Sequence, residues 1–199
     1  MDHDISRWPQ FLLAVTISCT VLTFVASTTL AGPALAAELA VAPEKNPPGD
    51  IPDTQVFIDY TSTSGFTLKV PEGWARTDTS DGASFVDKLD GVIIKEIVTV
   101  VPPTVANVKG QYVADLAGHV RAMKLGKVEA VKLPAGDAIR ISFSSNSDPN
   151  PVTDKQVRLE NEIYLYYAKG ELVSVELYAP YGADNVDQWR LMSRSFRWQ

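Results

Sequence analysis

Cysteine and histidine are scarce in this 199-residue sequence. The single cysteine, Cys19, lies in an apolar run near the N-terminus, so the remainder of the chain can form no internal disulfide and carries no thiol chemistry. The two histidines are His3, which precedes the apolar run, and His119. With one histidine after that run, neither a metal cluster of several histidines nor a Ser-His-Asp triad in its usual form is expected.

Long runs of lysine or arginine are also absent, and the formal net charge is −6. The chain therefore has no basic footprint for nucleic acid, and its acidic surface would be repelled by anionic lipid. The sequence contains no G-x-S-x-G, Walker, G-x-G-x-x-G or H-E-x-x-H motif. We therefore predict no catalytic residue, no cofactor and no metal site, and we expect a protein that is not an enzyme.

An almost unbroken apolar run, Phe11–Ala31, dominates the N-terminal part of the chain. Small residues at Ala34 and Ala36 follow it and fit the A-x-A pattern that a signal peptidase reads. Pro33 would end a helix just before this site. We predict that residues 1–36 are a secretory signal that is cleaved after Ala36.

Two alternatives remain open for this segment. The run is about 21 residues long, which is enough to span a bilayer (~20 residues), so residues 11–31 could be a retained membrane anchor. The third interpretation is lipidation of Cys19, for which Thr16-Ile17-Ser18 is a poor lipobox. In each case the domain that follows is expected to be extracytoplasmic, either secreted or periplasmic, or attached to the membrane.

Residues 37–54 include a proline-rich stretch, PEKNPPGDIPDT, with little that could be buried. This composition is typical of a stiff, extended linker or of a disordered N-terminus. From residue 55 to residue 199 the pattern is that of one domain with a proper core. We therefore divide the chain into a signal or anchor (1–36), a linker (37–54) and an α+β domain (55–199).

Alternating apolar residues predict several strands in this domain. The stretch Gly65–Trp74 contains a strand, Phe66–Val70, followed by a turn, and Trp74 is expected to close one end of the core. Val92–Val101 is apolar on both faces, which predicts a central strand that is covered on both sides. Strands are also expected before and after the polar loop 146–151.

Two helices are predicted. Asn107–Lys124 has apolar residues at helical spacing and would stop at Gly126. His119 lies off the apolar stripe and is expected to be a solvated helix residue. The last helix would begin after Asp184 or Asn185, and its inner stripe is expected to contain Val186, Trp189 and Met192.

The clearest hairpin joins Gln156–Tyr167 to Glu171–Tyr178 through a turn at Lys169-Gly170. One of its faces is expected to carry three apolar residues of the first strand and three of the second. These are Ile163, Leu165 and Tyr167, paired with Val173, Val175 and Leu177.

The opposite face of this hairpin is our candidate surface for a protein partner. Its residues are Tyr164, Tyr166, Tyr178, Glu160 and Glu162. Aromatic side chains are enriched at protein contacts, which favours recognition by this face. The alternative is that a helix covers the tyrosines and leaves only their hydroxyl groups at its edge.

The order of these patterns resembles the PsbP/Mog1-like superfamily. The resemblance is carried by the strand leading into Val70-Pro71-Glu72-Gly73-Trp74, the two-sided strand, one helix, a run of antiparallel strands, and the end from Asp187-Gln188-Trp189 to Ser195-Phe196-Arg197-Trp198. It covers about residues 55–199 and is closest in pattern to exported LpqN-type bacterial lipoproteins and PsbP-like proteins. It implies an α-β-α sandwich with a central, mostly antiparallel sheet flanked by helices, no cofactor of its own, and an accessory or binding role.

Three hypotheses for function follow. The preferred one is an exported, non-enzymatic accessory or binding protein that recognises a protein partner at the cell envelope. The second is a carrier of a small ligand, which needs an apolar pocket between sheet and helix. The third is a hydrolase that uses dispersed carboxylates, which needs two acidic side chains that converge in a cleft with raised pKa values.

Overall fold

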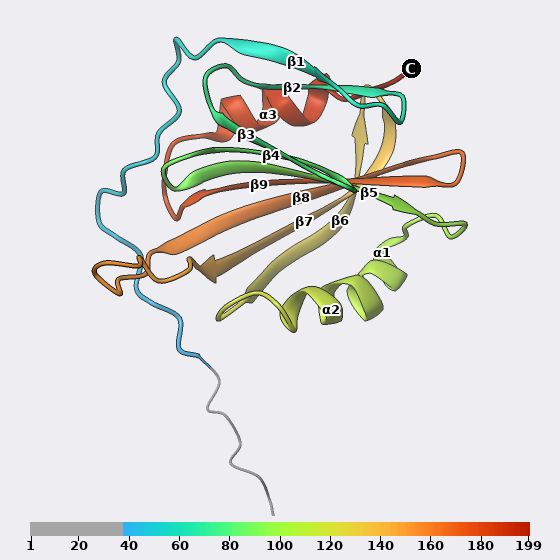
Figure 1. Cartoon of the computed structure of the whole chain (residues 1–199). Helices are drawn as coiled ribbons and strands as arrows, with labels where there is room; N and C mark the ends of the chain where they lie inside the picture. The colour runs from blue at the N-terminus through green and yellow to red at the C-terminus, as the bar shows by residue number, and fades with distance from the viewer. Residues whose placement is uncertain (1–37) are drawn as a thin grey trace, which may run out of the picture. The chain divides into compact units, whose positions relative to one another are not determined.

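The computed structural model describes residues 38–199, so the predicted signal or anchor and its cleavage site lie outside the described residues. In this range the chain forms two antiparallel sheets, of seven and three strands. Helices lie on both faces of the larger sheet (Figure 1). The predicted α-β-α arrangement around a mostly antiparallel sheet is confirmed.

The larger sheet positions every feature discussed below. In spatial order its strands are β3 (Ala75–Thr79), β4 (Gly82–Asp87), β5 (Asp90–Val98), β9 (Glu171–Pro180), β8 (Arg158–Ala168), β7 (Gly136–Asn146) and β6 (Lys124–Leu133). The central strands are long and apolar on both faces, which is what a sheet between two layers requires.

One face of this sheet is covered by α3 (Val186–Ser195) and by the small sheet, which comprises β1 (Phe57–Thr61), β2 (Phe66–Pro71) and β10 (Arg197–Trp198). The core here is built on stacked aromatic rings. Phe196 is fully buried, and its ring centroid lies 4.0 Å from that of Tyr166 and 5.1 Å from that of Phe66. Trp189 and Met192 face this core as predicted, whereas Val186 is 63% exposed.

The other face is covered by a short helical segment, which consists of α1 (Val105–Asn107), the π-helical turn η1 (Val108–Tyr112) and α2 (Val113–Ala117). Thr104 and Asn107 form a capping box at its start. It packs on a second apolar cluster that includes Ile141 and Leu165 of the sheet.

The predicted helix Asn107–Lys124 is too long at its C-terminal end. The helix stops at Ala117, and the N–H groups that follow make tighter bonds to residues three positions back, Gly118 to Asp115 and His119 to Leu116. Lys124 already begins β6, which places Gly126 inside a strand. A register irregularity separates Leu125 from Val128 in this strand, so the apolar spacing there was misleading.

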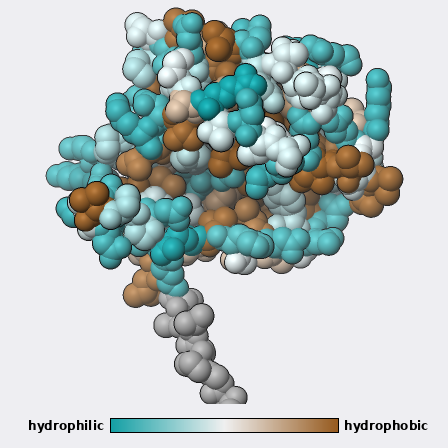
Figure 2. Space-filling view, in the orientation of Figure 1, coloured by the Kyte–Doolittle hydropathy of each residue, from teal (hydrophilic) through white to brown (hydrophobic). Residues whose placement is uncertain are grey.

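The predicted strand Val92–Val101 also ends early, at Val98. Its last pairing partner is Glu171, the first residue of β9, so no strand lies beside the residues that follow. Val98 is 93% exposed and Val100 is 88% exposed. Hydrophobic residues gather over this end of β5, at the right-hand edge of Figure 2. The prediction of cover on both sides is therefore wrong for this end of the strand.

Residues 38–51, which we call the strap, run along the domain without helix or strand (Figure 1). Ile51 is buried in the core, and its N–H donates to Asn185 Oδ1 at 2.6 Å. Asn185 Nδ2 in turn donates to the Gly49 carbonyl at 2.8 Å. Asn185 precedes α3 as predicted, but its side chain holds the strap instead of capping the helix. The strap is therefore part of the folded unit and not a separate linker.

Candidate functional site

Strand β8 carries four of the five predicted surface residues on one face. They are Glu160, Glu162, Tyr164 and Tyr166, and this face is directed toward α3. Their partners on β9 are apolar, for example Val175 opposite Tyr164. The structure therefore brings these four residues together, but against a helix.

Tyr178 lies on the opposite face, so the prediction that it shares a face with the other tyrosines is wrong. It pairs with Asn161, which lies between Glu160 and Glu162 in β8 and therefore on the other face of that strand. The two-residue turn at Lys169-Gly170, in which both residues have positive φ, fixes this register. A slip of one residue moves every side chain of a strand to the other face, which explains the error.

Tyr164 and Tyr166 are covered, as the alternative interpretation expected. Tyr166 is 2% exposed, and its hydroxyl donates to the Ser193 carbonyl of α3 at 2.6 Å. The Tyr164 hydroxyl donates to Glu162 Oε2 at 2.5 Å. Burial, together with the nearby Glu162 carboxylate, raises the pKa of Tyr164 to about 12. The rings therefore contribute to the core, while the carboxylates beside them face a groove.

This groove lies between α3 and strands β6 to β8. It has two parts, of about 330 and 490 Å³, which share Glu160, Glu162 and Trp189. Tyr164 lines the first part, and strap residues 40–43 help to wall the second. The predicted surface residues that remain accessible thus belong to a concave site of the size that ligands and peptide segments occupy.

Arg140 of β7 is the centre of the polar floor of the groove. Its Nη2 lies 2.5 Å from Glu129 Oε1 of β6, and its Nη1 lies 3.2 Å from Glu162 Oε1 of β8. The hydrogen bond and charge of Arg140 lower the pKa of Glu129. Burial and the charge of Glu162 raise the pKa of Glu160, which the Gly182 backbone only partly offsets.

Charged residues of both signs line the groove. On the floor, the Arg140 guanidinium lies between the carboxylates of Glu129 and Glu162, and α3 supplies Arg190 and Arg194 along the facing wall. Arg190 is paired with Asp187 at 2.9 Å on the exposed side of α3. The site therefore offers charged groups of both signs beside Tyr181, which is 45% exposed and belongs to a residue type that often dominates binding energy.

The sequence did not indicate Arg140 or Glu129 as members of this site. Each lies between apolar residues of its own strand, so the strand pattern alone shows only that its side chain points to the face opposite those apolar residues. The signal that was missing is the register between β6, β7 and β8, which places Glu129 directly across from Arg140 and Glu162 diagonally to it.

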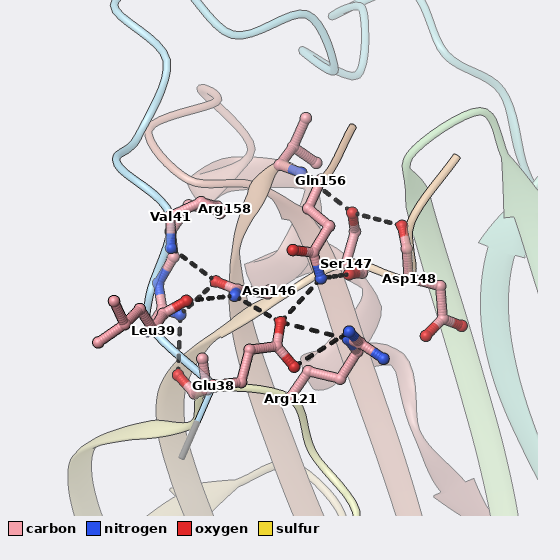
Figure 3. Close-up of polar contacts among 11 residues, drawn as sticks. Glu38, Leu39, Val41, Arg121, Asn146, Ser147, Asp148, Gln156 and Arg158 are labelled. Carbon is pink, nitrogen blue, oxygen red and sulfur yellow. Dashed lines mark hydrogen bonds and ion pairs between the residues drawn. The ribbon is translucent and has the colours of Figure 1, made fainter. Parts of the chain in front are cut away.

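The start of the strap is fastened at the ends of β7 and β8 (Figure 3). Asn146 accepts the Val41 N–H at 3.0 Å and donates to Glu38 Oε1 and to the Leu39 carbonyl, both at 2.9 Å. Arg121 lies 3.1 Å from Glu38 Oε2. Hydrogen bonds from Asn146 and from Gln156 lower the pKa of Glu38. The buried side-chain amide of Asn146 thus binds three residues of the strap, Glu38, Leu39 and Val41.

We expect Asn146→Ala to release this end of the strap. Loss of these bonds should lower the free energy of unfolding by about 1–3 kcal/mol, because buried polar groups lose their partner. Trypsin should then cut more rapidly after Lys45, which is exposed within the strap. Asn150→Ala, in the neighbouring loop, is the control and should leave cleavage unchanged. An equal rate of cleavage after Lys45 in all three proteins would show that Asn146 does not hold the strap.

Residues 38–199 contain neither a cluster of metal-binding side chains nor a helix that could span a membrane. Within this range, no three histidine, cysteine, aspartate or glutamate side chains come close enough together to hold a metal ion. None of the helices in this part of the chain has the length and apolar character needed to traverse a bilayer.

Comparison with known proteins identifies the fold. No protein-family model matches the sequence, and no curated protein matches it significantly. The structure is similar to cyanobacterial PsbP (CyanoP) from Synechocystis sp. PCC 6803, with a TM-score of 0.54 and 15% identity over 77% of this chain and 100% of that one. This similarity confirms the predicted PsbP-like fold: the chain has an α+β fold similar to that of PsbP.

Two weaker similarities are to proteins of other organisms. The Ran-binding protein Mog1p of Saccharomyces cerevisiae has a TM-score of 0.47 and 11% identity, over 72% of this chain and 96% of that one. LpqN of Mycobacterium tuberculosis, described as involved in cell envelope biogenesis, has a TM-score of 0.44 and 12% identity, over 73% and 91%. At such identities a shared fold does not transfer a function.

Proposed function

We propose that this chain is an exported, non-enzymatic accessory protein that binds a protein partner at the cell envelope through the groove beside α3. The observation that carries the proposal is the Glu129–Arg140–Glu162 network beside an open groove that also exposes Arg190 and Tyr181. Aromatic residues and arginine are enriched at protein contacts, and charges of both signs suit an extended polypeptide segment. The predicted leader supports export, to a secreted or periplasmic location or to the membrane through residues 11–31.

The groove supports binding better than the hydrolase alternative. A carboxylate-based hydrolase would need two acidic groups free to act on a substrate. Glu162 is occupied by Arg140 and by the Tyr164 hydroxyl, which leaves Glu160 as the one carboxylate of this pair without a side-chain partner among the described residues. The groove floor is therefore arranged as a charged contact surface.

Site-specific photo-crosslinking in the native host tests this proposal. A photoreactive residue at Arg190, on the wall of the groove, should give a discrete protein adduct. The same group at Lys109, which is exposed on the opposite helical layer, is the matched control and should not give that adduct. Glu162→Arg, which reverses a floor charge, should reduce the adduct several-fold. Adducts that are absent, or equal at both positions, would count against the groove as the binding surface.

A further inference from the structure

A second hollow, of about 420 Å³, lies on the face of the large sheet opposite α3. Its floor comes from β5, β7, β8 and β9, and its rim comes from the β4–β5 turn, the α2–β6 loop and the β7–β8 loop. The helical segment covers the neighbouring part of this face and leaves this part open. The volume is within the range of pockets that hold small organic ligands, about 300–1,000 Å³.

The floor of this hollow combines apolar and polar side chains. Ile93, Phe143 and Leu159 line it, and Tyr178 lies beside them. The Tyr178 ring packs directly over Gly91, where an added Cβ would lie 2.3 Å from ring atoms. Asn161 is held in place by a hydrogen bond from its Nδ2 to Ser145 Oγ at 3.0 Å. The floor is therefore a fixed surface suited to an apolar group.

Glu176 is the charged residue among the strand residues that line this floor. It sits between Ile93 of β5 and Ile163 of β8 in the sheet register. Among residues 38–199, no cation lies within 4 Å of its carboxylate and no group forms a hydrogen bond with it. Burial raises the pKa of Glu176 to about 7, against the opposing effect of Lys95. A carboxylate in apolar surroundings without a partner destabilises a fold, and such groups gather at functional sites.

The charges at the rim restrict what can bind. Arg121 is paired with Glu38 of the strap, so its charge is already neutralised. Lys88 and Asp148 lie on opposite loops of the rim and have opposite signs. His119, also on the rim, forms a hydrogen bond with the Asp115 carbonyl. The Glu176 carboxylate is therefore the charged group on the floor that has no partner among the described residues, which calls for one positive group on the ligand.

We propose that this hollow binds a small organic cation, with its ammonium group on the Glu176 carboxylate and its apolar body against Ile93, Phe143 and Leu159. The ion pair would form in a partly desolvated place, where it is stronger than at an exposed surface. The ligand would supply the partner that the fold itself does not provide for Glu176. This site is separate from the groove beside α3, so either proposal can fail without the other.

Titration calorimetry of the full chain with hexylamine at pH 8 tests the proposal. Hexylamine is charged at this pH, and 1-hexanol is the neutral probe of the same length. We expect hexylamine to bind at one site at least about tenfold more tightly than hexanol, which corresponds to one ion pair. Glu176→Gln should remove this preference. Glu171→Gln, which lies on the same strand but on the other face, should retain it.

A second variant separates loss of binding from loss of folding. Ile93→Trp leaves Glu176 in place but fills the hollow, so it should weaken binding of both probes. Glu176→Gln removes an unpaired charge and should melt at the same temperature as the parent protein or higher at pH 8. Undiminished hexylamine binding by Glu176→Gln, or equal affinities of hexylamine and hexanol for the parent protein, would overturn the proposal.

Discussion

Replacing Phe196 with alanine is expected to lower the free energy of unfolding by about 4 kcal/mol, the largest effect expected from a single substitution in this core. Phe196 is fully buried, and its ring lies between aromatic rings of the two sheets. It stacks on Tyr166 of the large sheet and on Phe66 of the small sheet, and it meets the edge of Trp198. Alanine would leave a cavity that rigid neighbouring rings cannot fill.

Urea denaturation followed by circular dichroism measures this loss as a lower midpoint. Because domains of this kind are stabilised by about 5–15 kcal/mol in total, the variant should remain folded at low temperature but lose much of its margin. Val186→Ala is the matched control, since Val186 lies at the exposed start of α3. It should change stability by less than about 0.5 kcal/mol. A similar loss for the two variants would show that the aromatic stack contributes little.

The second large effect is a loss of stability as the pH rises from about 4 to about 8. Burial, together with the charge of Asp87, raises the pKa of Asp90 from 3.8 to about 7. Burial likewise raises the pKa of Glu176 from 4.5 to about 7. In this window the folded chain holds protons that the unfolded chain has released, so folding is favoured at the acidic end. Asp90 Oδ1 is buried without a hydrogen-bond partner among the described residues, which is consistent with this direction.

The double variant Asp90→Asn, Glu176→Gln should flatten this dependence. Each neutral side chain should stabilise the fold at pH 8 by about 1–3 kcal/mol and have little effect near pH 4, after allowance for solvent screening. The measurement is the free energy of unfolding in urea at several pH values. Lys88 and Asp50 near Asp90, and Lys95 near Glu176, are kept unchanged. Parallel pH curves for the variant and the parent protein would contradict the assignment of these two groups.

Much of the fold could be predicted from the sequence because apolar and polar residues alternate along a strand wherever one of its faces packs on a core. The strand that ends at the turn after Val70 was found in this way, and the helix containing Trp189 and Met192 was found from the helical spacing of its apolar residues. The end of β5 was not, because Val98 and Val100 are apolar without being buried. Apolar character predicts burial only where a neighbouring strand exists, and that depends on where β9 begins.

The candidate site was only partly predictable, because it depends on register between strands. Glu160 and Glu162 could be selected from β8 alone, whereas Arg140 joins them through the pairing of β7 with β8. Tyr178 was misplaced because β9 has apolar residues at positions of both parities, so its pattern does not choose a face. The turn at Lys169-Gly170 contained the missing information: with two loop residues, Ala168 must pair with Glu171, and every later pair follows.

The strap has a consequence for the order in which the domain is completed. Its contacts join residues that are far apart in sequence, 105 residues for Val41 with Asn146 and 134 for Ile51 with Asn185. Contacts across such separations carry a large loop-closure entropy and tend to form late. The first described segment to leave the ribosome can therefore be fixed only after β7, β8 and α3 have been made. Until then Glu38 has no bonds to Asn146, Gln156 or Arg121, and the strap is accessible to any protease that acts on the chain during its synthesis.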